Sequence, residues 1–531
     1  MLFGSDKRLE VALVILIAVI AAVVYSSFSW NLPWRFNSPD EMANANFSLR
    51  FAQNEELPIE APLNEVAGNN IVHPRSTTVI QGKLVPSSFL GLPLIYGSIA
   101  KFLGTDVLPY LTPFFGLLAL LALYFFIREL FDRRTALIFV VLVASLPAWW
   151  YYHTRAFFHN ALFFDLLAIL LYLSQKILRP GWAWQYILAG LVFGLALMVR
   201  TSEIFWLLAA AVVWFLFNHS KIRLGPTLAA GVSALVAFSP TLLMNKVIYG
   251  SYLSFGYRLG IEFTSINLEK SISFLRELIL PFGLHPQTMI LTVQNYLLGL
   301  QWWWTILAVV GVFFVIWNWL KFTSVQRSYL IAWLVASLWL VVLYGSWLFN
   351  DNPDPSAITL GTAYMRYWLP IFVFWLVPAS YLLSKLWHYR LSRLLVIAVI
   401  SAYLLLSWQL VMLDPEEGLI KIKQNIIRFE QTGQQVQALT SPEAVIVTGI
   451  TDKFFYPERQ VIVDLYKEND FFSVAKLIKA GIPVYHFHNT WHPAEFENYI
   501  NEQLEPFELS LKPVSHDLGT HSLYQYYLPT L

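Results

Sequence analysis

The chain has 531 residues, of which 57% are hydrophobic, 16% aromatic and 13% charged. This charge content is about half of the roughly 25% that is usual in soluble proteins, so it excludes an ordinary soluble globule and indicates a multi-pass membrane protein. The 35 basic and 34 acidic residues leave no net charge to steer nucleic acid, and the lack of cysteine excludes disulfides, thiolate metal sites and cysteine nucleophiles.

About eleven apolar stretches are long enough to cross a bilayer, because about 20 apolar residues span roughly 30 Å of hydrocarbon. In chain order they begin near Leu9, Leu108, Thr135, Asn160, Trp184, Ile204, Gly225, Gln301, Ser328, Tyr367 and Leu394. A further apolar segment, 86–103, either spans the membrane or lies along its surface. The predicted fold class is an α-helical polytopic membrane protein with about eleven transmembrane helices.

The distribution of basic residues decides the topology. If segment 86–103 does not span, lysine and arginine recur at every second connection, as they do at cytoplasmic ends. These residues are Lys7 and Arg8; Arg128, Arg133 and Arg134; Lys176 and Arg179; Lys221 and Arg223; Lys321 and Arg327; Lys385, Arg390 and Arg393. We therefore expect segment 86–103 to be a juxtamembrane helix and the N-terminus to be cytoplasmic, with an uncleaved first span.

This topology places three longer pieces in the outer compartment, namely loop 31–107, loop 245–300 and the tail 413–531. Residues 1–412 are expected to form the membrane domain with its two outer loops. In the tail the charge rises, and strand-like runs alternate with helix-like runs. The strand-like runs are 444–449, 460–466, 483–487, 507–513 and 522–528, and the helix-like runs are 418–439, 469–479 and 494–504. The tail is therefore predicted to be a separate small α/β domain.

Two adjacent carboxylates, Asp40 and Glu41, follow the first span. Ser38 and Pro39 before them are typical of a helix start, so both carboxylates are expected near a helix N-terminus at the membrane surface. One interpretation is a capping acid with a solvated neighbour. The other is a catalytic pair.

Polar residues at the outer ends of later spans favour the catalytic interpretation. A single arginine stands at each of three outer boundaries: Arg155, Arg200 and Arg366. Each could snorkel to lipid headgroups, but the three together favour one shared anionic ligand, because guanidinium binds phosphate in a bidentate manner. Their neighbours are His159, which would share a helix face with Arg155 if the fourth span begins there, and Glu203 and Tyr367.

Asp165 lies about five residues into the fourth span, where an acid is costly unless it faces the protein interior. We expect it to pair inside the bundle. The histidines His73, His153 and His285 could bind a divalent cation with the carboxylate pair, but their spacing matches no ligand signature, so metal dependence stays open. His73 and the neighbouring Arg75 are candidates that line the site.

The chain resembles the GT-C superfamily of membrane glycosyltransferases, in the branch of protein O-mannosyltransferases and of the aminoarabinose transferases that modify lipid A. The matching features are the Asp-Glu pair after the first span, VPSSFLGLPLIYGSIAKFLG at 85–104, FFIRELFDRRTALIFVVLVASLPAWWYYHTRAF at 125–157, YILAGLVFGLALMVR at 186–200 and RYWLP at 366–370. Their order covers nearly all of residues 1–390. The tail lacks the Trp-Trp-Asp motif of oligosaccharyltransferases, which argues against transfer of a preassembled oligosaccharide.

The resemblance implies a hexosyl- or pentosyltransferase that uses a polyprenyl-phosphate sugar as donor, inverts its configuration, and acts on the outer face of a prokaryotic cell membrane. It implies that Asp40 is the base, that Glu41 orients the site or the acceptor, and that Arg366 and Tyr367 hold the donor phosphate. The predicted topology adds Arg155 and Arg200 to the residues expected to bind the donor phosphate. The acceptor would be a protein, a lipid or a glycan.

A transporter or flippase of lipid-linked sugars is the alternative from a different class of function. Such carriers favour paired, broken helices with charges near the middle of the membrane. Here the charges gather at one face, and only Asp165 lies deeper. The sequence therefore favours the transferase.

Overall fold

The computed structural model describes residues 7–179, 183–258, 279–349, 354, 356–463, 465, 467–489 and 500–529. Its contacts divide the chain into two compact units. The first unit comprises Met1–Trp30, Pro109–Thr241 and Ile261–Lys421, and the second comprises Asn31–Leu108, Leu242–Gly260 and Ile422–Leu531.

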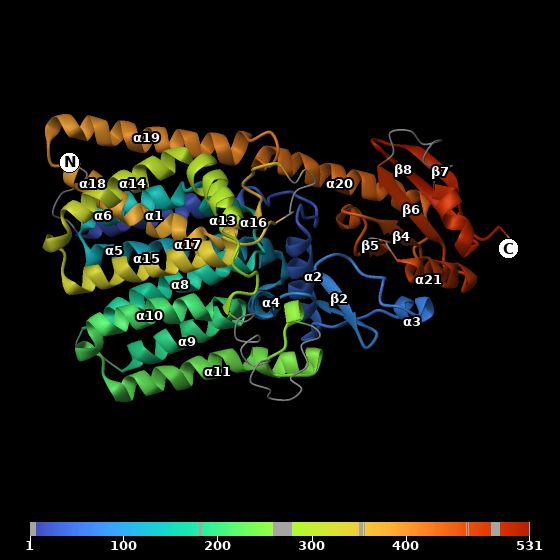
Figure 1. Ribbon diagram of the computed structural model, residues 1–531, viewed down its shortest axis with the longest axis horizontal. Coiled ribbons are helices and arrows are strands. Elements are labelled where there is room, and N and C mark those ends of the chain that lie inside the picture. The colour runs from blue at the N-terminus through green and yellow to red at the C-terminus, as the bar shows by residue number, and fades with distance from the viewer. Residues whose placement is uncertain are drawn as a thin grey trace. The chain divides into compact units, whose positions relative to one another are not determined.

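The first unit is a bundle of helices that run side by side (Figure 1). Their bounds are α1 (Lys7–Ser26), α5 (Leu111–Leu130), α6 (Arg133–Ala144), α7 (Pro147–Arg155), α8 (His159–Lys176), α9 (Trp184–Val199), α10 (Ile204–Asn218), α11 (Leu224–Tyr249), α13 (Pro286–Thr292), α14 (Trp302–Trp317), α15 (Ser324–Gly345), α16 (Ala363–Tyr367), α17 (Leu369–Phe374), α18 (Leu376–Leu386) and α19 (Arg390–Leu413). The last turns of α11 belong to the second unit.

Six of these helical stretches are long and apolar enough to cross a membrane: Thr105–Leu130, Thr201–Lys221, Leu224–Tyr249, Ser324–Gly345, Leu369–Leu386 and Arg390–Leu413. Two further candidates are pairs bent at a short break, Arg133–Ala144 with Pro147–Arg155 by 57° and Pro286–Gly299 with Trp302–Trp317 by 94°. All the predicted stretches fall on helices, but length and composition support up to eight spans among the described residues. The count of eleven stays a prediction.

Small residues let neighbouring helices of the bundle approach closely. A Cβ atom placed on Gly190 of α9 would lie 2.0 Å from the carbonyl oxygen of Ala230 in α11, and one placed on Gly194 would lie 2.3 Å from that of Ala234. Backbones packed this closely are typical of helix interfaces within membranes. The apolar, glycine-containing sequence of α9 therefore fits a bundle helix.

The second unit contains the first loop, which folds as α2 (Pro39–Asn54), β1 (Ile59–Glu60), α3 (Leu63–Ala67), β2 (Thr77–Ile80), β3 (Lys83–Pro86) and α4 (Gly91–Leu103). The strands form an antiparallel sheet in the order β1-β3-β2. Helix α4 lies within the predicted juxtamembrane segment, and its 13 residues are too few to cross about 30 Å of hydrocarbon at 1.5 Å per residue.

The tail forms the small α/β fold that its alternating pattern predicts. Helix α20 (Leu419–Leu439) is followed by β4 (Val445–Thr448), β5 (Gln460–Val463), α21 (Glu468–Lys479), β6 (Val484–Asn489), β7 (Ser510–Leu518) and β8 (His521–Tyr527). The sheet order is β5-β4-β6-β8-β7, with β4 parallel to β5 and β6 and the other pairs antiparallel. Most of the helix predicted at 494–504 lies outside the described residues, and β7 begins three residues later than predicted.

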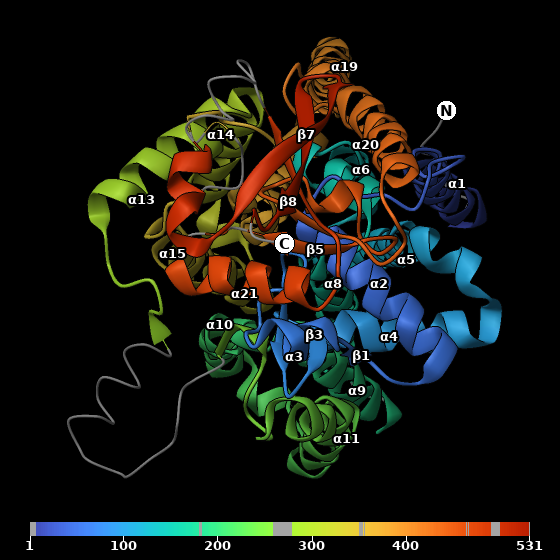
Figure 2. The same ribbon diagram turned by 90° about the vertical axis from the view of Figure 1, so that its right-hand side faces the viewer.

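The first loop and the tail share one hydrophobic core. Ala67 and Val72 of the loop pack with Val445, Ile462 and Val474 of the tail. Helix α3 lies beside α21 in both views (Figures 1 and 2). The contacts therefore group loop 31–107 with the tail, although the sequence assigned that loop to the membrane domain 1–412. The domain boundary at 413 stays a prediction.

Candidate functional site

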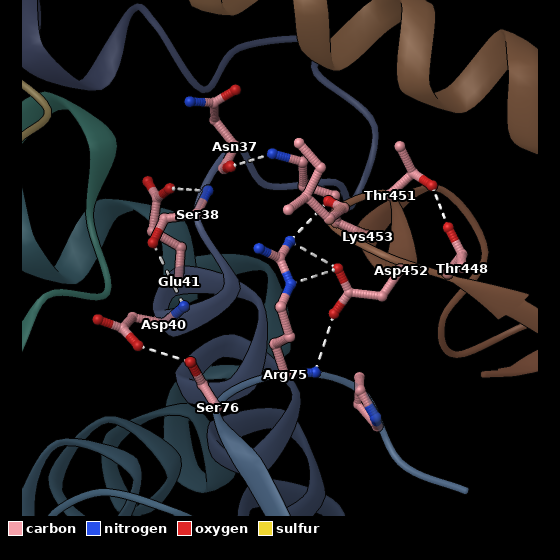
Figure 3. Close-up of polar contacts among 12 residues, drawn as sticks. Asn37, Ser38, Asp40, Glu41, Arg75, Ser76, Thr448, Thr451, Asp452 and Lys453 are labelled. Atoms are coloured by element: carbon pink, nitrogen blue, oxygen red, sulfur yellow. Dashed lines mark hydrogen bonds and ion pairs between the residues drawn. The ribbon is translucent and has the colours of Figure 1, made fainter. Parts of the chain in front are cut away.

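The carboxylate pair stands at the start of α2, where a capping box fixes the helix end. The backbone N–H of Asp40 donates to Ser38 Oγ at 3.3 Å, and the backbone N–H of Ser38 donates to Glu41 Oε2 at 2.8 Å. Pro39 occupies the first helical turn, as its fixed φ favours. Glu41 is 2% exposed and holds this cap, whereas Asp40 is only partly buried. Glu41 therefore caps the helix from a buried position, and Asp40 is the more exposed of the two carboxylates (Figure 3).

Asp40 accepts a hydrogen bond from the turn before β2. Ser76 Oγ donates to Asp40 Oδ1 at 2.7 Å, and Figure 3 shows the two side chains pointing toward each other. Ser76 has a φ of 59°, which is uncommon for a residue other than glycine. The serine therefore needs neighbours that hold its backbone in place.

Two consecutive residues of the tail, in the turn η7 (Asp452–Phe454), contact the first loop near Ser76 and Asp40. The Arg75 backbone N–H donates to Asp452 Oδ2 at 2.9 Å, and its Nε and Nη2 donate to Asp452 Oδ1 at 2.9 and 2.7 Å. Lys453 Nζ donates to the Asn37 carbonyl oxygen at 2.6 Å. The tail thus contacts the first loop just before α2 and just before Ser76 (Figure 3).

The predicted site residues His73 and Arg75 therefore lie at this contact between loop and tail. Arg75 binds the fully buried Asp452 carboxylate, and the backbone of His73 bridges to Ile462 of β5. The His73 ring Nδ1 lies 3.0 Å from the Pro74 carbonyl oxygen. Within the described residues, no group of three or more histidine, aspartate or glutamate side chains is placed to hold a metal ion.

In the first unit, two aromatic rings link the three arginines predicted at outer boundaries. The guanidinium carbons of Arg155 and Arg366 lie 5.2 and 5.0 Å from the centre of the Phe158 ring. Those of Arg366 and Arg200 lie 5.5 and 4.9 Å from the centre of the Tyr367 ring. We call Arg155, Phe158, Arg366, Tyr367 and Arg200 the arginine row.

Arg200 has a counter-ion in the same unit. Its Nε and Nη2 lie 2.8 and 2.7 Å from Glu203 Oε1, Nη2 donates to Tyr344 OH at 3.0 Å, and Nη1 donates to Asn160 Oδ1 at 3.3 Å. Tyr344 in turn stacks on Tyr367 with 4.3 Å between the ring centres. Arg200 and Glu203 are both buried. They form a buried ion pair that supports the tyrosine stack.

The break between α7 and α8 corrects one expectation. Helix α7 ends at Arg155 and α8 begins at His159, so these two residues do not share a helix face. Ala156 and Phe157 between them have φ values of 61° and 53°. These two positive φ values break the helix without a glycine or a proline, which is why the sequence did not reveal the break.

Asp165 and His153 join the two helices across this break. His153 Nε2 lies 2.9 Å from Asp165 Oδ1, and both side chains are fully buried. The His153 ring also stacks on Trp149 with 4.0 Å between the ring centres. Asp165 thus pairs inside the bundle, as expected, and the pair fixes the corner that carries Arg155 and Phe158.

Comparisons with known proteins agree with this architecture. Residues 105–244 match the family model described as dolichyl-phosphate-mannose-protein mannosyltransferase, while no curated protein matches the chain. The fold is similar to that of ArnT from Cupriavidus metallidurans bound to undecaprenyl phosphate, with a TM-score of 0.57 and 12% identity over 98% of both chains.

The fold is also similar to that of the archaeal oligosaccharyltransferase AglB from Archaeoglobus fulgidus in complex with an inhibitory peptide and a dolichol-phosphate. The TM-score is 0.53 and the identity 13%, over 91% of this chain and 70% of that one. The chain therefore shares its fold with ArnT and AglB, and residues 105–244 within this fold match the mannosyltransferase family model.

Proposed function

We propose that the protein transfers a sugar from a polyprenyl-phosphate donor to an acceptor hydroxyl on the outer face of the membrane, with inversion at the anomeric carbon. The observation that carries this proposal is the arginine row, which gathers three cations and two aromatic rings in one unit. Guanidinium groups suit a lipid-linked phosphate because they donate two parallel hydrogen bonds to its oxygens.

Within the row, the three arginines differ in what they can offer a donor. Arg200 is committed to Glu203, Asn160 and Tyr344, so its part is to hold Tyr367 against Tyr344. Arg366 is partly buried and lies between Phe158 and Tyr367. We assign the donor phosphate to Arg366, and Arg155, which contacts the same Phe158 ring, is the second candidate contact.

Asp40 is the proposed base. As the acceptor oxygen bonds to the anomeric carbon, its proton moves to the Asp40 carboxylate. The bond between that carbon and the phosphate oxygen breaks, and its electron pair stays on the phosphate. The arginines stabilise this growing negative charge in the transition state.

Replacing Asp40 by asparagine tests the base. We expect Asp40→Asn to lower transfer by at least about 100-fold, the usual contribution of a general base, while donor binding and membrane insertion stay normal. Asp106→Asn is the matched control, because Asp106 is an exposed aspartate at the far end of the same loop region. Transfer that survives in Asp40→Asn at the level of Asp106→Asn would remove the proposed base.

A further inference from the structure

Two consecutive tail residues, Asp452 and Lys453, contact the first loop on both sides of the start of α2. We propose that Ser76 is a positioning residue for Asp40, and that the tail sets Ser76 in place through the Arg75–Asp452 pair. This inference rests on the proposed function, because it takes Asp40 as the base. In this proposal the tail takes part in the transfer, because it helps to position Asp40.

Ser76 contacts Asp40 directly. The 2.7 Å hydrogen bond from Ser76 Oγ holds one carboxylate oxygen of Asp40. A hydroxyl that donates to a carboxylate oxygen restricts the rotamer of that carboxylate side chain. Ser76 therefore sets the direction in which the Asp40 carboxylate points.

The backbone of Ser76 has an uncommon conformation that its neighbours must hold. A φ of 59° costs free energy in a serine and persists only where the surroundings impose it. Thr77 Oγ1 donates to the Pro74 carbonyl oxygen at 2.6 Å, and the Ser87 backbone N–H donates to the Ser76 carbonyl oxygen at 3.2 Å. These bonds shape the turn, and Arg75 ties it to the tail.

Several hydrogen bonds attach Arg75 to the tail. Arg75 makes three hydrogen bonds to Asp452 and one from Nη2 to the Ile450 carbonyl oxygen at 2.6 Å. The Asp452 side chain is fully buried. The backbone carbonyl oxygen of Asp452 accepts hydrogen bonds from the backbone N–H groups of Phe455 and Tyr456. In this charge-assisted contact two guanidinium N–H groups donate to one carboxylate oxygen and the backbone N–H donates to the other, so both partners are restricted. The residue before Ser76 is thus fixed to a rigid turn of the tail.

A second contact between loop and tail shows what a purely structural tie looks like. Asn69 Nδ2 donates to Asp470 Oδ1 at 3.2 Å, near the start of α21. No described hydrogen bond relays this contact to Asp40, whereas Arg75 directly precedes the serine that binds Asp40. Asn69 is therefore the matched control residue.

The experiment measures kcat and KM for the full-length protein in lipid nanodiscs, with a polyprenyl-phosphate sugar and its acceptor. We expect Ser76→Ala and Asp452→Asn each to lower kcat about 10-fold, since small misplacements of a reacting group carry penalties up to about 100-fold. Donor KM should change less than about twofold, because the donor contacts are untouched. The double variant should be no slower than the slower single variant, because both changes break one chain of contacts.

Asn69→Ala should keep kcat even if it lowers the melting temperature. Arg75→Lys, which keeps the charge and loses the fork, should lie between wild type and Asp452→Asn. Wild-type kcat in Ser76→Ala, losses that multiply in the double variant, or an equal loss in Asn69→Ala would each overturn the inference. If Asp40→Asn is inactive and Ser76→Ala is normal, only this inference falls; if Asp40→Asn is active, the proposed base falls with it.

Discussion

Arg366 illustrates how the surroundings of a residue set its role. Its guanidinium lies between the Phe158 and Tyr367 rings, and it is only partly buried. Arg200, which also contacts the Tyr367 ring, is buried against Glu203. Two arginines that look alike in the sequence therefore divide into a proposed ligand contact and a support.

Replacing Arg366 by alanine tests this division. We expect Arg366→Ala to weaken donor binding at least about 10-fold and to leave the acceptor KM unchanged, because a hydrogen bond to a charged group contributes about 1.5–3 kcal/mol. Arg390→Ala, an exposed arginine at the start of α19, should bind donor normally. A defect confined to the acceptor would show that the phosphate lies elsewhere.

The sequence shows single charged residues, but it does not show which residues they contact. Single arginines at the ends of apolar runs were visible, and so was the Asp40-Glu41 pair with its capping signal. Ser76 and Asp452 were not, because a serine in a turn and an aspartate in a distant domain carry no local signal. Only the tertiary contact, across 377 positions for Arg75 and Asp452, gives them a part.

Strand β6 carries two histidines, His486 and His488, whose pKa values are lowered in the folded tail. His486 Nδ1 lies 2.8 Å from Tyr526 OH of β8. Burial, with a smaller effect of His488, lowers the pKa of His486 to about 3, and burial also lowers the pKa of His488. In the unfolded chain, histidine titrates near about 6.5. The folded tail therefore holds His486 neutral where the unfolded chain would be charged.

This difference predicts an acid-sensitive tail. The contribution of neutral His486 to the stability of the folded tail is complete above the pKa of histidine in the unfolded chain. This contribution is lost as the pH falls from about 6.5 toward about 3, because the unfolded state then binds more protons. Hydrogen exchange of β6 and β8, corrected for intrinsic rates, should show weaker protection at pH 5 than at pH 7, and His486→Gln should reduce the difference. Equal protection at the two pH values would contradict this account.

The elements that the sequence predicted best are those with a long, uniform pattern. Helices α10, α11, α15 and α19 have such runs and lie where they were expected. The breaks were harder to predict. Pro147 accompanies the 57° bend between α6 and α7, whereas the 94° bend before α14 has neither proline nor glycine pairs and follows a π-helical stretch, Val293–Gly299.

Helix α19 makes the topology of the whole molecule testable. It runs from Arg390 to Leu413 and is long and apolar enough to span. A reporter fused after Leu413 should be active on the outer side, and one fused after Tyr389 should be active in the cytoplasm. The reverse pattern would place the tail inside and would contradict the assignment of the basic loops.

The grouping of the chain into two units could not be predicted from composition. The sequence places loop 31–107 and the tail in the outer compartment, but it does not show that Ala67 and Val72 pack in one core with Ile462. Such contacts use a few apolar residues at long separation, with no periodic pattern. Because of these contacts, the tail belongs to the same unit as Asp40.

The most direct test of the central claim is whether the purified protein consumes a lipid-linked sugar. A panel of short-chain polyprenyl-phosphate sugars would be incubated with wild type and Asp40→Asn, with cell-envelope extract as a source of acceptor, and free polyprenyl phosphate would be measured. We expect wild type to release polyprenyl phosphate from one donor, and Asp40→Asn to lose that release. No release from any donor, combined with movement of an intact donor across a vesicle membrane, would contradict it and identify a carrier.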